Sequence, residues 1–170
     1  MNGDPAACCA HAGHVSPSGA ASGWVVPWLE GEQRTIEDVF RWAEHTGELE
    51  LEIEAASEHG VYEDAVRAMG ELLGGDRLPR GQAATRRVTV AARDRPRLLV
   101  ELLAELAFLA ERDGFVPDAL EGLTAGPTEL DANVRGRLGD PANLVKAATY
   151  HRLRFEHEDG GWRARAVLDV

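Results

Sequence analysis

The sequence predicts an α+β fold in which two helices pack on a mixed, largely antiparallel sheet. Two stretches carry apolar side chains at helical spacing, and several others alternate apolar and polar side chains as strands do. The chain also finishes in two alternating runs joined by Gly160-Gly161, which is typical of a β-hairpin. Because 170 residues suffice for one core, we expect one domain over residues 35–170.

The first 34 residues are expected to be a disordered leader. They are rich in Gly, Ala, Ser and Pro, and they contain no Lys or Arg before their last residue. Within them Cys8, Cys9, His11 and His14 form a group of potential metal ligands. Because this group lies in a segment without apolar periodicity, we interpret it as an incidental zinc site at most.

Leu49 to Ala55 is the first predicted strand. Leu49, Leu51 and Ile53 alternate with glutamates, so the apolar side chains should face a core and the glutamates should face water. The segment before this strand has two interpretations. Thr35 begins a pattern that resembles a helix start, whereas residues 39–46 also fit an extended segment.

Two amphipathic helices follow from spacing and end signals. The first runs through Tyr62 to Leu73 and stops at Gly74-Gly75, because glycine commonly ends a helix. Asp94 and Pro96 open the second helix, which has a leucine-rich stripe. We assign Met69 and Phe108 to the core. The leucines of the stripe are Leu99, Leu102, Leu103, Leu106 and Leu109.

The remaining strands are predicted from alternation. They cover residues 86–92, 115–123 and 128–138, and a terminal hairpin covers residues 144–170. On the last strand, apolar and charged side chains take opposite faces. The apolar face carries Trp162, Ala164, Ala166, Leu168 and Val170, and the other carries Arg163, Arg165 and Asp169.

Composition narrows the class of partner. The formal charge of −11 opposes binding to nucleic acid or to an acidic membrane, because phosphate groups would be repelled. No apolar run approaches the roughly 20 residues of a membrane helix, and no basic signal-peptide start is present. We therefore expect a cytoplasmic protein with neither a membrane nor a direct, sequence-specific nucleic-acid partner.

Chemistry-bearing residues are concentrated in two clusters. The sequence has no phosphate loop, nucleophile elbow, His-Glu-x-x-His or Cys-x-x-Cys motif, which argues against an autonomous enzyme. One cluster is Glu44 to Glu48, and the other is Lys146 to His151 together with Asp169-Val170. Lys146 is the only lysine of the chain, and its compact charge differs from the planar fork of an arginine.

At these clusters the sequence resembles the archease family, small proteins that assist RtcB-type RNA ligases. The family pattern His-Thr-Ala-Asp corresponds to His45-Thr46-Gly47-Glu48, and Val-Lys-Ala-x-Thr-Tyr-His corresponds to residues 145–151. A Gly-Trp strand that ends in Asp and an aliphatic residue corresponds to Gly161-Trp162 and Asp169-Val170. The resemblance covers residues 41–170 and implies an archease-like domain.

The resemblance implies an accessory protein rather than an enzyme, one that promotes GTP-dependent guanylylation of the ligase and its multiple turnover. It also implies a divalent cation, calcium above all with magnesium or manganese as alternatives, at Glu48, Asp169 and Val170. These oxygen ligands suit such hard cations. Lys146, His45 and His151 are implied to face the partner. Glu48 departs from the family aspartate, and its carboxylate lies one methylene further out.

Two alternatives remain open. One is a stand-alone metal-dependent hydrolase or phosphotransferase that uses Glu48, His45 and His151 around the metal. The other is a binding module that keeps the fold without the metal, as the change from aspartate to Glu48 suggests.

Overall fold

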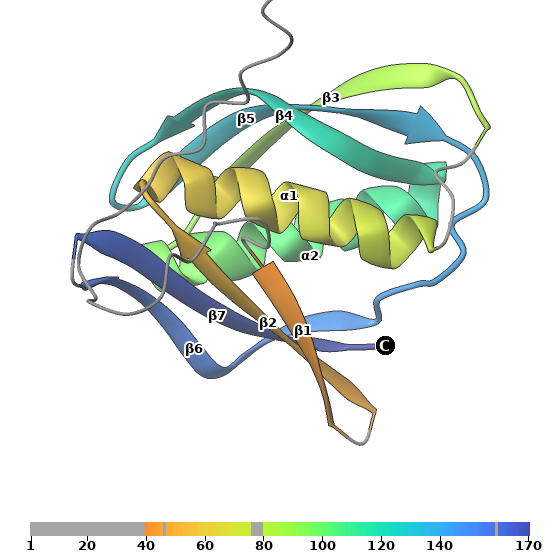
Figure 1. Ribbon diagram of the computed structural model, residues 1–170. Coiled ribbons are helices and arrows are strands. Elements are labelled where there is room, and N and C mark those ends of the chain that lie inside the picture. The colour runs from red at the N-terminus through yellow and green to blue at the C-terminus, as the bar shows by residue number, and fades with distance from the viewer. Residues whose placement is uncertain (1–39, 46, 76–79, 159) are drawn as a thin grey trace, which may run out of the picture. The chain divides into compact units, whose positions relative to one another are not determined.

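A computed structural model describes residues 40–45, 47–75, 80–158 and 160–170, which form an α+β domain (Figure 1). Within these residues seven strands and two helices follow one another along the chain. In order they are β1 (Phe40–His45), β2 (Glu48–Ala55), α1 (Glu58–Gly74), β3 (Ala83–Ala91), α2 (Arg95–Asp113), β4 (Phe115–Ala125), β5 (Glu129–Leu138), β6 (Ala147–Glu158) and β7 (Gly161–Asp169). The predicted leader, with its Cys8, Cys9, His11 and His14, lies outside the described residues.

The strands form two antiparallel sheets. One has the order β1-β2-β7-β6 and the other has the order β3-β5-β4. Figure 1 shows both helices between the two sheets, and each helix contacts strands of both, α1 at β2 and β4 and α2 at β6 and β3. The predicted α+β class with two helices is confirmed. Its strands lie in two sheets, and the chain passes between these sheets twice, through α1 from β2 to β3 and again from β5 to β6.

Helix α2 begins after the predicted Asp94 and α1 ends at the predicted Gly74-Gly75, whereas α1 begins at Glu58, before the predicted Tyr62. Ser57 accepts a hydrogen bond from the main-chain N–H of Gly60 at 3.0 Å, and Asp94 accepts one from Arg97 at 3.0 Å. The helices end at Gly75 and Gly114. The leucine stripe of α2 is buried with the apolar face of α1, so the core lies between the sheets.

Two core assignments have different outcomes. Met69 is fully buried, as predicted. Phe108 is 47% exposed, so its assignment to the core was wrong. Successive helix positions are about 100° apart, which places Phe108 on the far side of the helix from Leu106. Its ring lies instead under the Arg112 guanidinium, 4.7 Å from the ring centroid.

Strand β1 settles the ambiguous segment for residues 40–45. These residues are extended and pair antiparallel with β2, so the extended interpretation is confirmed for them. The connection passes through Gly47 at φ +78°, a left-handed conformation that glycine adopts without steric cost.

Strand β2 follows its predicted alternation with one exception. Leu51 and Ile53 are buried in the core, as predicted. Glu50 is only 6% exposed, so the expectation that every glutamate of this strand faces water was wrong. The carboxylate of Glu50 is covered by two arginines, Arg165 of β7 and Arg152 of β6.

Strand β6 contains a bulge in the terminal hairpin. Its pairing with β7 stops at Thr149, opposite Val167, and resumes at Arg154, opposite Arg165. Between these two pairs β6 has four residues, 150–153, where β7 has only one. We call these four residues the β6 bulge. Arg152 in this bulge has φ +51°, the one positive φ among the non-glycine residues described.

Candidate functional site

The entrance of β2 and the end of β7 lie side by side. Glu48 stands directly opposite Asp169 in the antiparallel register. Residues in such a pair point to the same face with Cβ atoms about 5 Å apart. His45 of β1 pairs with Glu48 on the other side of β2, and the structure does not describe the side chain of His45. Two residues that are more than a hundred positions apart in sequence thus place their carboxylates together.

Lys146, the residue directly before β6, joins this pair. Its Nζ donates a hydrogen bond to the main-chain oxygen of Val170 at 2.6 Å and lies 3.9 Å from Oδ1 of Asp169. Its main-chain N–H donates to the carbonyl oxygen of Asp169 at 2.8 Å. We call Glu48, Lys146, Asp169 and Val170 the C-terminal corner. The lysine side chain remains 67% exposed, so the corner is open to solvent.

A shallow pocket adjoins the corner. It has a volume of about 280 Å³ and is lined by Glu44, Gly47, Glu48, Leu49 and Val170. A larger groove of about 540 Å³ shares Glu44 and Leu49 with it and extends to Trp42 and the end of α1. The corner therefore opens into a surface depression that has room for additional ligands.

The chemistry of the corner fits a hard cation. Its donors are the carboxylates of Glu48 and Asp169 and the main-chain oxygen of Val170, all oxygen atoms of the kind that calcium and magnesium take. Among the side chains that the structure describes, which do not include that of His45, Glu48 makes no ion pair and Asp169 pairs only with Lys146. Side chains alone do not complete a site, since the described residues hold no group of three or more His, Cys, Asp or Glu placed for a metal ion. Cation binding at Glu48, Asp169 and Val170 stays a prediction, and water or a partner would supply the other ligands.

His151 lies apart from these contacts. It belongs to the β6 bulge and is exposed. The contacts of the corner that the structure describes join Lys146 to Val170 and Asp169 and do not include His151. The corner thus gathers Glu48, Lys146, Asp169 and Val170 from the predicted residues, while His151 stands on the neighbouring bulge.

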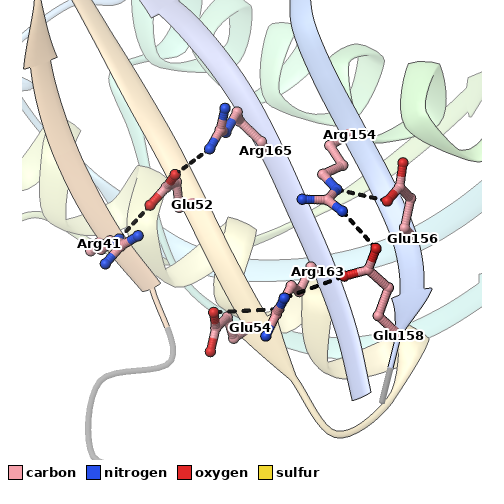
Figure 2. A network of polar contacts seen from close by, with 8 residues as sticks. All are labelled: Arg41, Glu52, Glu54, Arg154, Glu156, Glu158, Arg163 and Arg165. Carbon is pink, nitrogen blue, oxygen red and sulfur yellow. Dashed lines mark hydrogen bonds and ion pairs between the residues drawn. The ribbon is translucent and has the colours of Figure 1, made fainter. Parts of the chain in front are cut away.

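Further along the same face, charges are paired throughout. Glu52 of β2 accepts hydrogen bonds from Arg41 of β1 and from Arg165 of β7 (Figure 2). The hydrogen bond from Arg41, followed by that from Arg165, holds the pKa of Glu52 below its usual value even though partial burial opposes this. We call this region the paired end; its members, shown in Figure 2, are Arg41, Glu52, Glu54, Arg154, Glu156, Glu158, Arg163 and Arg165.

Sequence reasoning missed Glu50, which lies between the corner and the paired end. Its Oε1 is 3.3 Å from Nε of Arg165, and its Oε2 is 3.8 Å from Nη1 of Arg152. The contact of Oε2 with Arg152 is too long for a hydrogen bond, so Oε2 is buried without a hydrogen-bond partner. Alternation assigns Glu50 to the polar face but carries no signal for the bulge that covers it.

Comparison with known proteins gives a family match. Residues 40–170 match the family model described as "Archease protein family (MTH1598/TM1083)". A protein archease from Methanosarcina mazei is 28% identical over 140 residues, which is 77% of this chain and 95% of that protein. A protein archease from Methanothermobacter thermautotrophicus is 29% identical over 118 residues, or 65% of this chain and 83% of that protein.

Two solved structures have a similar fold. The solution structure of protein 1598 from Methanobacterium thermoautotrophicum aligns with a TM-score of 0.61 at 24% identity, over 78% of this chain and 99% of that one. The crystal structure of an archease from Thermotoga maritima, described as a possible chaperone, aligns with a TM-score of 0.56 at 20% identity, over 75% and 94%. Among the residues described here, neither helix is long and apolar enough to cross a membrane.

Proposed function

The chain belongs to the archease family, and on that premise we propose that it is an accessory protein which activates an RtcB-type RNA ligase. In this role it would promote GTP-dependent guanylylation of the ligase and permit multiple turnover in tRNA splicing or RNA repair, without joining RNA itself. The observation that carries the proposal is the C-terminal corner. There the residues at the positions of the family motifs come together in space: Lys146, Asp169 and Glu48, which stands where the family has aspartate.

The proposal gives the corner a divalent cation, with calcium first and magnesium or manganese as alternatives. Glu48, Asp169 and Val170 would hold it through oxygen atoms, which is the donor set that such ions prefer. When bound, the ion supplies positive charge between two carboxylates that otherwise repel each other. Lys146 holds the oxygen of Val170 at 2.6 Å, so it fixes the position of that donor.

Charge supports a basic protein partner. The chain has a formal charge of −11, and Glu48 is without a compensating cation among the described residues. A ligase that binds RNA offers a positively charged surface to which such a corner is complementary. The proposal places both proteins in the cytoplasm, with Lys146, His45 and His151 facing the ligase.

The test is ligation turnover by the ligase of the same organism, measured with GTP in the presence and absence of this protein. We expect many rounds of ligation only when the protein is present. Lys146→Ala and Asp169→Ala should lose this stimulation, because both lie in the corner. Glu156→Gln is the matched control, since Glu156 is also exposed but belongs to the paired end. Failure of the wild-type protein to stimulate ligation contradicts the proposal.

The two alternatives give different results with the purified protein alone. Turnover of small phosphorylated substrates without any ligase would favour the metal-dependent hydrolase or phosphotransferase. Calorimetric titration with calcium separates the metal-free binding module, which requires that no saturable binding occurs.

A further inference from the structure

Glu50 is a buried charged residue that does not belong to the C-terminal corner. The residue is only 6% exposed, and Oε2 has no hydrogen-bond partner. Burying a carboxylate is unfavourable unless opposite charges and hydrogen bonds compensate for lost water. The compensation here consists of Arg165, which Glu50 shares with Glu52, and of Arg152 in the β6 bulge.

The β6 bulge is itself unfavourable as local structure. It interrupts the ladder with β7 between Thr149 and Arg154, and it places Arg152 in the left-handed region at φ +51°. Residues other than Gly, Asn and Asp rarely adopt that conformation, which persists only when surrounding contacts enforce it. The Oγ1 atom of Thr149, where the bulge begins, is also buried without a hydrogen-bond partner.

Three contacts hold the bulge in this conformation. Tyr150 donates a hydrogen bond through its hydroxyl to Glu101 of α2, and Arg97 lies 5.7 Å from its ring centroid. Arg152 reaches Glu50 of β2 on the sheet face away from the helices. Between these contacts the bulge exposes Tyr150, which is 53% accessible, and the imidazole of His151.

We infer that Glu50 is a positioning residue, which holds the β6 bulge on the sheet through Arg152 and so fixes Tyr150 and His151 for contact with a protein partner. The identity of that partner rests on the proposed function, whereas the hold on the bulge does not. The inference gives a reason for the buried charge, for the left-handed arginine and for the interrupted ladder, each of which folding alone would disfavour.

The first test measures amide hydrogen exchange, residue by residue, in the full chain. In Glu50→Gln, which keeps the side-chain shape and removes the charge, exchange at the paired residues that flank the bulge, 147–149 and 154–155, should be about tenfold faster than in wild type, because the ladder beside the bulge loosens with it. Glu54→Gln is the matched control, because Glu54 lies on the same strand and face and pairs with Arg163 outside the bulge. Its exchange at these flanking residues should match wild type.

A double-variant comparison tests the route through Arg152. Arg152→Gln alone should accelerate exchange beside the bulge as Glu50→Gln does, and the two changes together should add little, because each removes the same contact. Unchanged exchange beside the bulge in Glu50→Gln, or fully additive effects, would overturn the inference. If Glu50→Gln does not fold, Arg152→Gln decides the question, because the Arg152 side chain is 56% exposed.

The second test concerns the partner and uses ligase stimulation at a temperature where every variant is fully folded. Glu50→Gln should raise the protein concentration needed for half-maximal stimulation by about fivefold and leave the maximal rate unchanged. The reason is that a loose bulge weakens binding to the ligase, whereas the residues of the corner keep their contacts. An unchanged half-maximal concentration overturns the positioning role at the partner. Absence of stimulation by wild type would instead contradict the proposed function, while the exchange result still decides whether Glu50 holds the bulge.

Discussion

The paired end and the C-terminal corner lie on one sheet and share strands β2 and β7, yet they differ in how far opposite charges compensate their glutamates. At the paired end Glu52 contacts two arginines, and Arg163 contacts both Glu54 and Glu158 (Figure 2). At the corner Glu48 has no ion pair among the described residues. The same Glu-x-Glu pattern of β2 therefore leads to a compensated surface at one end and an uncompensated one at the other.

The difference comes from the partner strand. Across from β2, strand β7 places Arg165 opposite Glu52 and Arg163 opposite Glu54, but Asp169 opposite Glu48. Opposite charges that face each other across two strands are favourable, and like charges are not. A protein selected only for stability would not place two carboxylates in register, so the corner is where we expect function and the paired end is where we expect stability.

Arg165→Met is expected to have the largest effect on this comparison. The change removes the contact of Arg165 with Glu52 at 2.6 Å and with the buried Glu50 at 3.3 Å. Leaving a buried carboxylate with one weak partner should cost about 3 kcal/mol of unfolding free energy. Urea unfolding measures this loss. Arg154→Met is the control, because its partners Glu156 and Glu158 are partly exposed and its removal should cost under about 1 kcal/mol. Equal losses would break the assignment of stability to Glu50 and Arg165.

Asp169→Asn should behave in the opposite way. It removes one carboxylate of the proposed cation site, so calcium affinity measured by calorimetry should fall by about tenfold or more. The side chain is 48% exposed, and its only ion pair in the described chain is a 3.9 Å contact with Lys146. Unfolding free energy without calcium should therefore stay within about 0.5 kcal/mol of wild type. Unchanged affinity would remove Asp169 from the site, and a wild type without saturable binding would favour the metal-free module.

The sequence predicts more of the corner than of its surroundings, for physical reasons. Alternation assigns each side chain of β2 to a face, and the predicted buried positions Leu51 and Ile53 are confirmed. Motif resemblance selected Glu48 and Asp169, which the structure then places opposite each other, although their role as cation ligands stays a prediction. Burial of Glu50 escaped prediction because it depends on the β6 bulge, a long-range pairing fault with no local signature. The division into two sheets escaped for the same reason, since alternation does not encode strand order.

The pH dependence of the free energy of unfolding tests the ion pairs of Glu52 at the paired end. The pKa of Glu52 is lowered from its ordinary 4.5, mainly by the hydrogen bond from Arg41. A carboxyl group with a lowered pKa in the folded state stabilises the fold above its unfolded pKa, and this stability is lost as the pH falls through the folded pKa. Glu52→Gln should therefore be less stable than wild type by about 1 kcal/mol at pH 7. The difference should shrink once the pH falls below 4.5. Urea unfolding across this range measures it, and a difference independent of pH would contradict the ionic account.

The smallest expected effect separates the backbone of Arg152 from its side chain. Arg152→Ala and Arg152→Gly both remove the contact with Glu50, but only glycine relieves the left-handed conformation at φ +51°. That relief is worth about 1–2 kcal/mol, and the greater freedom of glycine in the unfolded chain offsets about 0.5–1 kcal/mol of it. The glycine variant should thus be more stable than the alanine variant by about 0.5 kcal/mol in urea unfolding. Arg154→Gly against Arg154→Ala is the control and should show the reverse order, because residue 154 lies in the regular part of β6 where glycine is unfavourable. If the glycine variant is less stable than the alanine variant at both positions, the backbone is not strained at Arg152. The contact with Glu50 then enforces no unfavourable conformation.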